Sequence, residues 1–343
     1  MSLLLRTFLA LAVVLALPLS SSATTKKKKG AADPAAAAAS AKPADRDYSG
    51  AIVIDAADGK VLFEDNADAT SYPASVTKLM NLLLCVEAIE AGKAHLNDRI
   101  TASAEEAKMG GTQVFLKEGE VFTMEEYLYA MMIQSANDAA LALAKHVGGS
   151  REEFVARMNQ RAGQLGMNHT KFVTPHGLAS PKQQADTSTP RDIATLSREV
   201  IKHPLALQLT ATKERTFRKE PLLVMRNHNK LLWQMPGCDG LKTGYLTRGG
   251  FALSATVYRD GKRVIAVVMG SRGGVHGSQR DTIARRLIGE AMPKASPLPA
   301  NMIPKEPEPE AALPVGAHSP AGEGADETDE AAPMVHFNTP GAK

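Results

Sequence analysis

The stretch Ser75-Val-Thr-Lys-Leu-Met-Asn-Leu-Leu-Leu-Cys-Val-Glu-Ala-Ile-Glu90 decides how this chain folds. From Lys78 onward it is apolar on almost every side, which predicts a helix buried at the centre of a domain. Gly92 stands where that helix is expected to stop. Because positions i and i+3 share one face of a helix, the side chains of Ser75 and Lys78 are expected to meet at its start.

Two further short strings follow in the chain, Ser135-Ala136-Asn137 and Lys242-Thr243-Gly244. At ordinary residue frequencies, S-x-x-K and S-x-N are each expected by chance about once in a chain of this length, and K-T-G in roughly one chain in ten. Each string alone is therefore weak. Their order, spacing and local context together indicate one site.

A serine beside a lysine is a candidate nucleophile beside a candidate base. The Ser75 hydroxyl needs a group that takes its proton, and Lys78 can reach back to it. To act as a base, Lys78 must have a pKa well below its usual value of about 10.4, and burial and a second cation both lower it. Lys242 is the candidate second cation. The alternative is an ordinary serine-capped helix with a surface lysine.

The second string lies at the junction of two expected amphipathic helices, 124–133 and 138–147. A hydroxyl at this junction, that of Ser135, is placed to relay a proton, and the Asn137 amide is placed to hold a substrate carbonyl. The alternative is that one of these side chains caps the second helix.

The third string lies on an expected strand. Lys242 and Thr243 are candidates to hold a substrate carboxylate, and Gly244 leaves room for a peptide along the strand edge. The backbone N–H groups of Ser75 and Tyr245 are candidates for the two donors of an oxyanion hole. The alternative is an ordinary exposed strand end.

The strands are expected near both ends of the domain and the helices in its middle. Two hairpin patterns centre on Asp58-Gly59 and Asp260-Gly261, and helix starts are expected at Ser150 and Thr189. A final helix is expected over 278–292. Hairpin-linked strands favour an antiparallel sheet, so we predict an α/β domain of the α+β type, with about five strands and a helical insertion after the second.

The first 23 residues have the pattern of a secretory signal. Arg6 precedes the apolar run 7–19, and Ser21-Ser22-Ala23 offers small residues for cleavage after Ala23. The alternative is an uncleaved anchor, although the run is shorter than the ~20 residues that a membrane-spanning helix needs. We therefore expect an exported bacterial protein of the periplasm or cell wall, attached to a membrane only if this segment is retained.

Two low-complexity segments flank the expected domain, residues 46–293. The linker 24–45 is basic and rich in Ala and Pro, and its run Lys26–Lys29 is either a solvated spacer or a contact for anionic lipid or wall polymer. The tail 294–343 holds eight acids and three bases and is expected to be disordered. The net charge of +3 is thus split between the two ends and says nothing about partners. No feature indicates nucleic acid.

The chain has two cysteines, Cys85 and Cys238. In an exported protein they can form a disulfide, but the sequence does not show that they are close. Two buried free thiols are the favoured interpretation.

Longer strings around these motifs resemble the low-molecular-mass penicillin-binding proteins, specifically the serine D-alanyl-D-alanine carboxypeptidases of the S11 peptidase type. The resemblance covers about residues 46–293. It rests on Tyr72-Pro-Ala-Ser-Val-Thr-Lys-Leu-Met, Val114-Phe-Leu-Lys-Glu-Gly-Glu, Gln134-Ser-Ala-Asn-Asp-Ala-Ala, Gly166-Met-Asn-His-Thr-Lys-Phe, His176-Gly-Leu, Asn229-Lys-Leu-Leu-Trp and Asp239-Gly-Leu-Lys-Thr-Gly.

The resemblance implies a β-lactamase/transpeptidase-like fold, with a five-stranded antiparallel sheet flanked by helices and a helical subdomain. It implies the D-Ala-D-Ala end of the peptidoglycan stem peptide as substrate, β-lactam antibiotics as covalent inhibitors, and no metal or cofactor. The residue roles that it implies are acylation of Ser75, base catalysis by Lys78, lining of the cleft by Ser135 and Asn137, and binding of the terminal carboxylate by Lys242 and Thr243.

The sequence departs from the family pattern in two places. Some members have an arginine for the carboxylate where this chain has His228, so that role passes to His228 or to nearby Arg226 or Arg248. Larger members also have a second, β-rich domain and an amphipathic anchor helix. Here the acidic tail stands in their place, which leaves membrane contact open.

Three other functions compete with the carboxypeptidase. A β-lactamase needs an acid that activates water; no Glu-x-x-Leu-Asn string lies between Asn137 and Lys242, and Asp186 and Glu214 are the remaining acids considered. A DD-endopeptidase that cleaves peptidoglycan cross-links uses the same site and is the main alternative. A non-catalytic wall-binding protein is expected to lack Ser75 or Lys78, and both are present.

Overall fold

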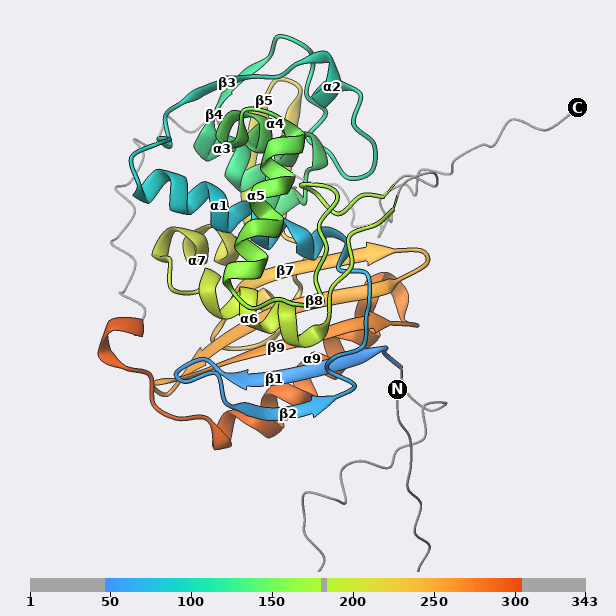
Figure 1. Cartoon of the computed structure of the whole chain (residues 1–343), viewed down its shortest axis with the longest axis vertical. Coiled ribbons are helices and arrows are strands. Elements are labelled where there is room, and N and C mark those ends of the chain that lie inside the picture. The colour runs from blue at the N-terminus through green and yellow to red at the C-terminus, as the bar shows by residue number, and fades with distance from the viewer. Residues whose placement is uncertain (1–46, 180–183, 304–343) are drawn as a thin grey trace, which may run out of the picture. The chain divides into compact units, whose positions relative to one another are not determined.

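A five-stranded antiparallel sheet forms the centre of the protein (Figure 1). The computed structural model describes residues 47–179 and 184–303. The sheet has the order β2-β1-β9-β8-β7, and its strands are β1 (Gly50–Asp55), β2 (Val61–Asp65), β7 (Cys238–Leu246), β8 (Gly250–Arg259) and β9 (Lys262–Ser271). Both predicted hairpins are present, and pairing of β1 with β9 joins the two ends of the domain. The predicted fold class is confirmed.

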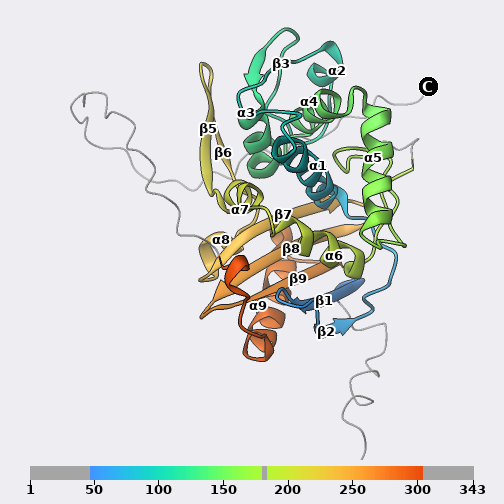
Figure 2. The same cartoon turned by 60° about the vertical axis from the view of Figure 1, so that its left-hand side comes forward.

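Alternating side chains of the sheet pack into two separate hydrophobic cores, as the two-residue period of a strand requires. On β1, Ile52 and Ile54 belong to the core that contains helix α1 (Lys78–Glu90), whereas Ala51 and Val53 belong to the core under helix α9 (Ser278–Ala291). Figure 2 shows α9 on one face of the sheet and the other long helices on the opposite face. The site therefore forms on the face that α1 covers.

Helix α1 lies at the centre of the helical part, as its sequence predicts. The helices around it are α4 (Asn137–Gly148), α5 (Arg151–Gln164), α6 (Pro190–Val200) and α7 (Pro204–Ala211). The Ser150 side chain accepts a hydrogen bond from the Glu153 N–H, and that of Thr189 accepts one from the Asp192 N–H, so both predicted helix starts are confirmed. The expected helix 124–133 is instead α3 (Met124–Tyr129) followed by a π-helical turn, Ala130–Gln134.

The sequence analysis missed several short elements. Two small antiparallel pairs lie outside the central sheet, and there are also two single-turn α-helices. These are β3 (Arg99–Thr101) with β4 (Val121–Thr123), β5 (Glu214–Lys219) with β6 (Leu222–Arg226), α2 (Ala104–Ala107) and α8 (Leu231–Gln234). Strands of three residues are too short to show an alternating pattern, and β5 is largely polar.

The two cysteines are free thiols, as favoured from the sequence. Cys85 is buried, and burial raises the pKa of its thiol. Cys238 is only half-buried, and burial raises its pKa to about 11. Both side chains are therefore protonated and unreactive at neutral pH.

The expected signal segment, the basic linker and most of the acidic tail lie outside the described residues. Within 47–179 and 184–303, no helix combines the length and the apolar character needed to cross a membrane. The packed chain extends beyond residue 293, where we placed the domain boundary. Ala295 and Leu298 are buried, and the N–H groups of Ser296 and Leu298 bond to Asp55 Oδ2 and the Gly261 carbonyl over 2.7 and 2.8 Å.

This packing predicts different effects for two truncations. Ending the chain after Pro293 removes buried Leu298 and is expected to lower the free energy of unfolding by about 2–5 kcal/mol, the usual cost of deleting a buried leucine side chain. Ending the chain after Ile303 is expected to leave the stability unchanged. Urea denaturation followed by circular dichroism measures both. Equal stability of the two truncated chains would show that residues 294–303 do not support the fold.

Candidate active site

Ser75 lies in a short 3₁₀ turn, Ala74–Thr77, that leads directly into α1. Lys78, the first residue of α1, donates a hydrogen bond from Nζ to Ser75 Oγ over 3.0 Å. The contact expected from the S-x-x-K spacing is therefore present. Ser75 is half-buried while Lys78 is fully buried, so the serine is the more accessible member of the pair.

Two glycines fix the position of this turn. A Cβ on Gly177 would lie 1.9 Å from the Ala74 carbonyl oxygen, and one on Gly244 would lie 2.5 Å from the Pro73 carbonyl oxygen. Gly177 also has φ +85°, a conformation that glycine adopts without strain. The space at Gly244 is thus filled by the Ser75 turn of the same chain, and not by a peptide as we expected.

The amine of Lys78 is surrounded by neutral acceptors. Besides Ser75 Oγ, it donates to Asn137 Oδ1 over 2.7 Å and to the His176 carbonyl oxygen over 2.6 Å. Burial lowers the pKa of Lys78 well below its usual value, and the charge of Lys242 lowers it further, while the more distant Asp186 and Asp138 oppose the shift. A neutral amine within 3.0 Å of a serine hydroxyl is a competent general base.

A second serine–lysine pair lies beside the first. Lys242 on β7 donates from Nζ to Ser135 Oγ over 3.0 Å, and both side chains are buried. Ser135 ends the π-helical turn in a left-handed conformation, with φ 62°, which points its side chain toward β7. Burial and the charge of Arg280 lower the pKa of Lys242 to about 7, so this amine exchanges protons readily at neutral pH.

Asn137 connects the Lys78 amine to a loop of the helical part. Its Oδ1 accepts from Lys78, and its Nδ2 donates to the Gly110 carbonyl over 2.9 Å. Its backbone N–H bonds to the Thr112 carbonyl over 2.8 Å. The side chain therefore positions Lys78, a role that differs from the substrate contact expected for it, although one N–H of the amide is left for a substrate.

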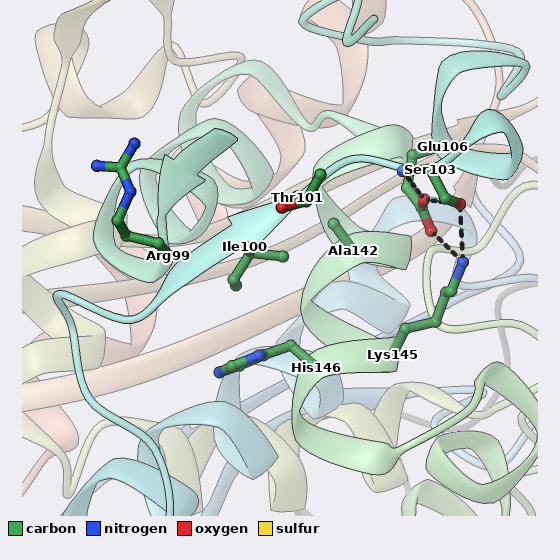
Figure 3. Close-up of a pocket in the computed structure, with 8 residues that line it drawn as sticks. All are labelled: Arg99, Ile100, Thr101, Ser103, Glu106, Ala142, Lys145 and His146. Atoms are coloured by element: carbon green, nitrogen blue, oxygen red, sulfur yellow. Dashed lines mark hydrogen bonds and ion pairs between the residues drawn. The ribbon is translucent and has the colours of Figure 1, made fainter. Parts of the chain in front are cut away.

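A third serine–lysine pair, Ser103 with Lys145, lies in the hollow between β3 and α4 (Figure 3). Lys145 Nζ donates to Ser103 Oγ, again over 3.0 Å, but it also forms an ion pair with Glu106 Oε1 over 2.9 Å. Partial burial works to lower the pKa of Lys145, but hydrogen bonds and charges from Glu106 and Glu105 outweigh it and raise the pKa. This lysine is a permanent cation and cannot act as a base at neutral pH.

Strand β7 brings the rest of the third string to the Ser75 turn. It is an edge strand of the central sheet, and Thr243 is buried while Tyr245 is exposed. Among the described residues, neither the Thr243 hydroxyl nor the Ser75 backbone N–H has a hydrogen-bond partner. Both groups are left for a ligand, and their roles as a carboxylate contact and an oxyanion donor stay predictions.

The cations proposed to assist Lys242 are placed differently from one another. His228 lies at the surface, but desolvation of its ring and the charge of Lys242 lower its pKa to about 4, so the ring is neutral at pH 7. Arg226 pairs with Glu214 over 3.2 Å, and the Arg248 guanidinium stacks on Tyr72, 4.7 Å from the ring centroid. None of these three is an unpaired cation beside Lys242.

The sequence analysis missed Arg280, near the start of α9. Its Nη1 donates over 3.4 Å to the carbonyl of Ala252, the β8 residue that pairs with Gly244 on β7, and its charge lowers the pKa values of both Lys242 and His228. Arg280 is buried and bonds to its neighbour Asp281 over 2.6 Å. Arginine near a helix start is common, and only the fold places this one beside β7.

The two acids considered for a β-lactamase are both occupied. The Asp186 carboxylate is buried and accepts four hydrogen bonds from other parts of the chain. Glu214 lies in the β5–β6 pair and bonds to Arg226. Neither carboxylate is available to activate a water for deacylation.

These features agree with comparisons to known proteins. A sequence model of the D-alanyl-D-alanine carboxypeptidases, peptidase family S11, matches residues 36–273. The chain belongs to this family. The family predicted from the sequence is thereby confirmed.

Curated S11 relatives include D-alanyl-D-alanine carboxypeptidase DacF of Bacillus subtilis, 38% identical over 223 residues, and DacC of Escherichia coli, 38% identical over 229 residues. Each alignment covers 64% of this chain and 57% and 56% of the relatives, respectively. The chain thus spans a little more than half the length of these curated relatives.

Solved structures of penicillin-binding proteins are also similar to this chain. Penicillin-binding protein 5 of Haemophilus influenzae has a TM-score of 0.66 and 30% identity, covering 73% of this chain and 72% of that one. Penicillin-binding protein D2 of Listeria monocytogenes, solved in its ampicillin-bound form, has a TM-score of 0.63 and 29% identity over 71% of this chain and 97% of that one.

The close contact at Gly244 predicts the effect of a single methyl group. Gly244→Ala is expected to lower the free energy of unfolding by about 1–3 kcal/mol, because its Cβ meets main-chain atoms of the Ser75 turn. Gly289→Ala is the control, since nothing lies within 4 Å of its Cβ position in α9. There the change is expected to stabilise by about 0.5–1 kcal/mol, because alanine is the better helix former. Equal effects in urea denaturation would contradict the packing described for Gly244.

Proposed function

We propose that this protein is a serine-type D-Ala-D-Ala carboxypeptidase, which removes the C-terminal D-Ala from peptidoglycan stem pentapeptides through an acyl-enzyme on Ser75. One observation supports the proposal most strongly. The Lys78 amine lies 3.0 Å from Ser75 Oγ, is fully buried, and forms its other hydrogen bonds with neutral acceptors. A non-catalytic wall-binding protein does not need such a pair.

The two buried serine–lysine pairs can perform the two halves of the reaction. In acylation, neutral Lys78 takes the proton of Ser75 as Oγ bonds to the carbonyl carbon. The C–N bond then breaks, and the leaving amine takes a proton from the Ser135 hydroxyl, which Lys242 replaces. In deacylation these transfers reverse, so that Lys242 receives the proton of the attacking water through Ser135, and Lys78 returns its proton to Ser75.

Lys242 and Thr243 are the candidate contacts for the terminal carboxylate of the substrate, and the charge of Arg280 acts on this site through Lys242. An arriving carboxylate raises the pKa of Lys242 from about 7, because an opposite charge favours the protonated amine. Substrate binding therefore supplies Lys242 in the protonated form that the leaving amine requires. The Ser75 and Tyr245 N–H groups are the proposed oxyanion donors.

β-Lactam antibiotics are the proposed inhibitors, by the same attack of Ser75 on a carbonyl. Structures of the Listeria relative in its ampicillin- and cefotaxime-bound forms support this proposal. The family and the apolar segment 7–19 support an exported protein of the periplasm or cell wall. Membrane attachment follows only if the signal segment is retained.

Covalent labelling tests the nucleophile directly. A fluorescent penicillin is expected to label the wild type and not Ser75→Ala, with both proteins folded by circular dichroism. Ser103→Ala is the matched control, because its hydroxyl also lies 3.0 Å from a lysine, Lys145, whose pKa is raised. This variant is expected to keep full labelling. Persistent labelling of Ser75→Ala would refute the proposed nucleophile.

Product analysis distinguishes the carboxypeptidase from a DD-endopeptidase. We expect pentapeptide muropeptides to lose one D-Ala faster than cross-linked dimers are split, because Lys242 and Thr243 are the proposed contacts for a free terminal carboxylate. A pentapeptide amidated at that carboxyl is the control. It is expected to react roughly ten- to a hundredfold more slowly, the usual effect of losing a charge-assisted hydrogen bond. Rapid dimer cleavage with little release of D-Ala would make the protein an endopeptidase.

A further inference from the structure

Asp186 is a buried carboxylate whose oxygens are both fully used. Oδ1 accepts the N–H groups of Val173 and Thr174 over 2.6 and 2.9 Å. Oδ2 accepts the hydroxyls of Thr174 and Thr77 over 2.8 and 3.2 Å. Burial raises the pKa of Asp186, and the two N–H groups and two hydroxyls oppose this shift by favouring the ionised form, which only accepts.

These four donors come from two parts of the chain that both contact the reacting groups. Thr77 is the last residue of the Ser75 turn, and it is fully buried. Val173 and Thr174 open the segment 173–178, which contains His176 and Gly177. Asp186 is therefore the polar link between the turn that presents the nucleophile and the segment packed against it.

The segment 173–178 in turn determines where the Lys78 amine lies. Thr174 Oγ1 donates to Asp186 and accepts the Gly177 N–H over 2.8 Å, which fixes the bend at His176. The His176 carbonyl then accepts from Lys78 Nζ over 2.6 Å, and Gly177 packs against the Ala74 carbonyl. A shift of this segment would therefore displace both the carbonyl that accepts a hydrogen bond from Lys78 and the glycine that packs against the Ser75 turn.

We propose that Asp186 is a positioning residue for the reaction at Ser75, holding the Ser75 turn and the His176 carbonyl in one rigid arrangement through Thr77 and Thr174, with its negative charge directed at the Lys78 site. This inference rests on the proposed function of Ser75 and Lys78. It gives the carboxylate a role distinct from the water activation considered for a β-lactamase.

The charge of Asp186 is one of a small set around Lys78. Lys242 faces it from β7 and lowers its pKa, whereas Asp138 from α4 and Asp186 from its loop raise it. His176 is neutral, because burial lowers its pKa to about 3, and His228 is neutral as well. Asp186 therefore limits how far burial depresses the pKa of the base.

Three variants separate the positioning effect from the charge effect. Thr77→Val removes one hydroxyl from Asp186 but keeps the carboxylate charge, and Thr77→Ser restores the hydroxyl. Asp186→Asn keeps the shape of the side chain and removes the charge. The rate of penicillin acylation is measured from pH 5 to 10, and ¹³C NMR of labelled lysine side chains follows the titration of Lys78 without depending on activity.

Thr77→Val is expected to lower the plateau rate of acylation roughly tenfold, because small misplacements of reacting groups are costly, with no shift in pH dependence. Thr77→Ser is expected to match the wild type. In Asp186→Asn the loss of a negative charge lowers the pKa of Lys78. The rise of the acylation rate with pH and the NMR titration of Lys78 are therefore both expected to move to lower pH, by about one unit. The maximal acylation rate of this variant is also expected to fall.

Each failure has a separate meaning. A wild type that penicillin does not acylate refutes the proposed function, while the NMR titrations still test the charge effect. A Thr77→Val rate within a factor of about two of wild type overturns the positioning role, since loss of a working contact costs more. An unshifted Lys78 titration in folded Asp186→Asn overturns the charge effect. If Asp186→Asn does not fold, the Thr77 pair still decides the positioning role.

Discussion

The structure of the site depends on keeping the Lys78 amine buried without a carboxylate in contact with it. Burying an ammonium costs several kcal/mol, so a lysine in this position favours its neutral form. The fold reduces the free-energy cost of burying this amine by giving it uncharged hydrogen-bond acceptors, the Asn137 amide and the His176 carbonyl. A carboxylate in their place would pair with the amine and make it a permanent cation, as Glu106 does for Lys145.

Much of the surrounding structure serves this arrangement. The Ser75 turn fits between β7 and the segment 173–178 only because Gly244 and Gly177 have no side chains. Two buried carboxylates, Asp138 and Asp186, lie near enough to affect the pKa of Lys78, but their oxygens are occupied by donors from the chain. They tune the base from a distance and do not neutralise it.

The sequence predicted the parts of the site that depend on local spacing. The contact of Ser75 with Lys78 spans one helical turn, and the S-x-x-K string specifies it. The contact of Lys242 with Ser135 joins residues 107 positions apart, and only the family resemblance placed them together. The His176 carbonyl had no signal, because a main-chain oxygen leaves no trace in residue identity. Arg280 was missed because its sequence context, Ser-Gln-Arg-Asp, is typical of any helix start.

Three serine–lysine pairs in the described part of the chain have the same 3.0 Å contact, and their surroundings give them different chemistry. Beside Lys145, carboxylates fix the proton on the amine, so the pair is structural. Ser135 and Lys242 are both buried, and the pKa of Lys242 is about 7, which suits proton relay, while the buried Ser135 hydroxyl is less accessible than Ser75. Among these three pairs, only Ser75 combines a half-buried position with a fully buried lysine whose pKa lies well below its usual value. Distance therefore does not identify the nucleophile; local charge and access do.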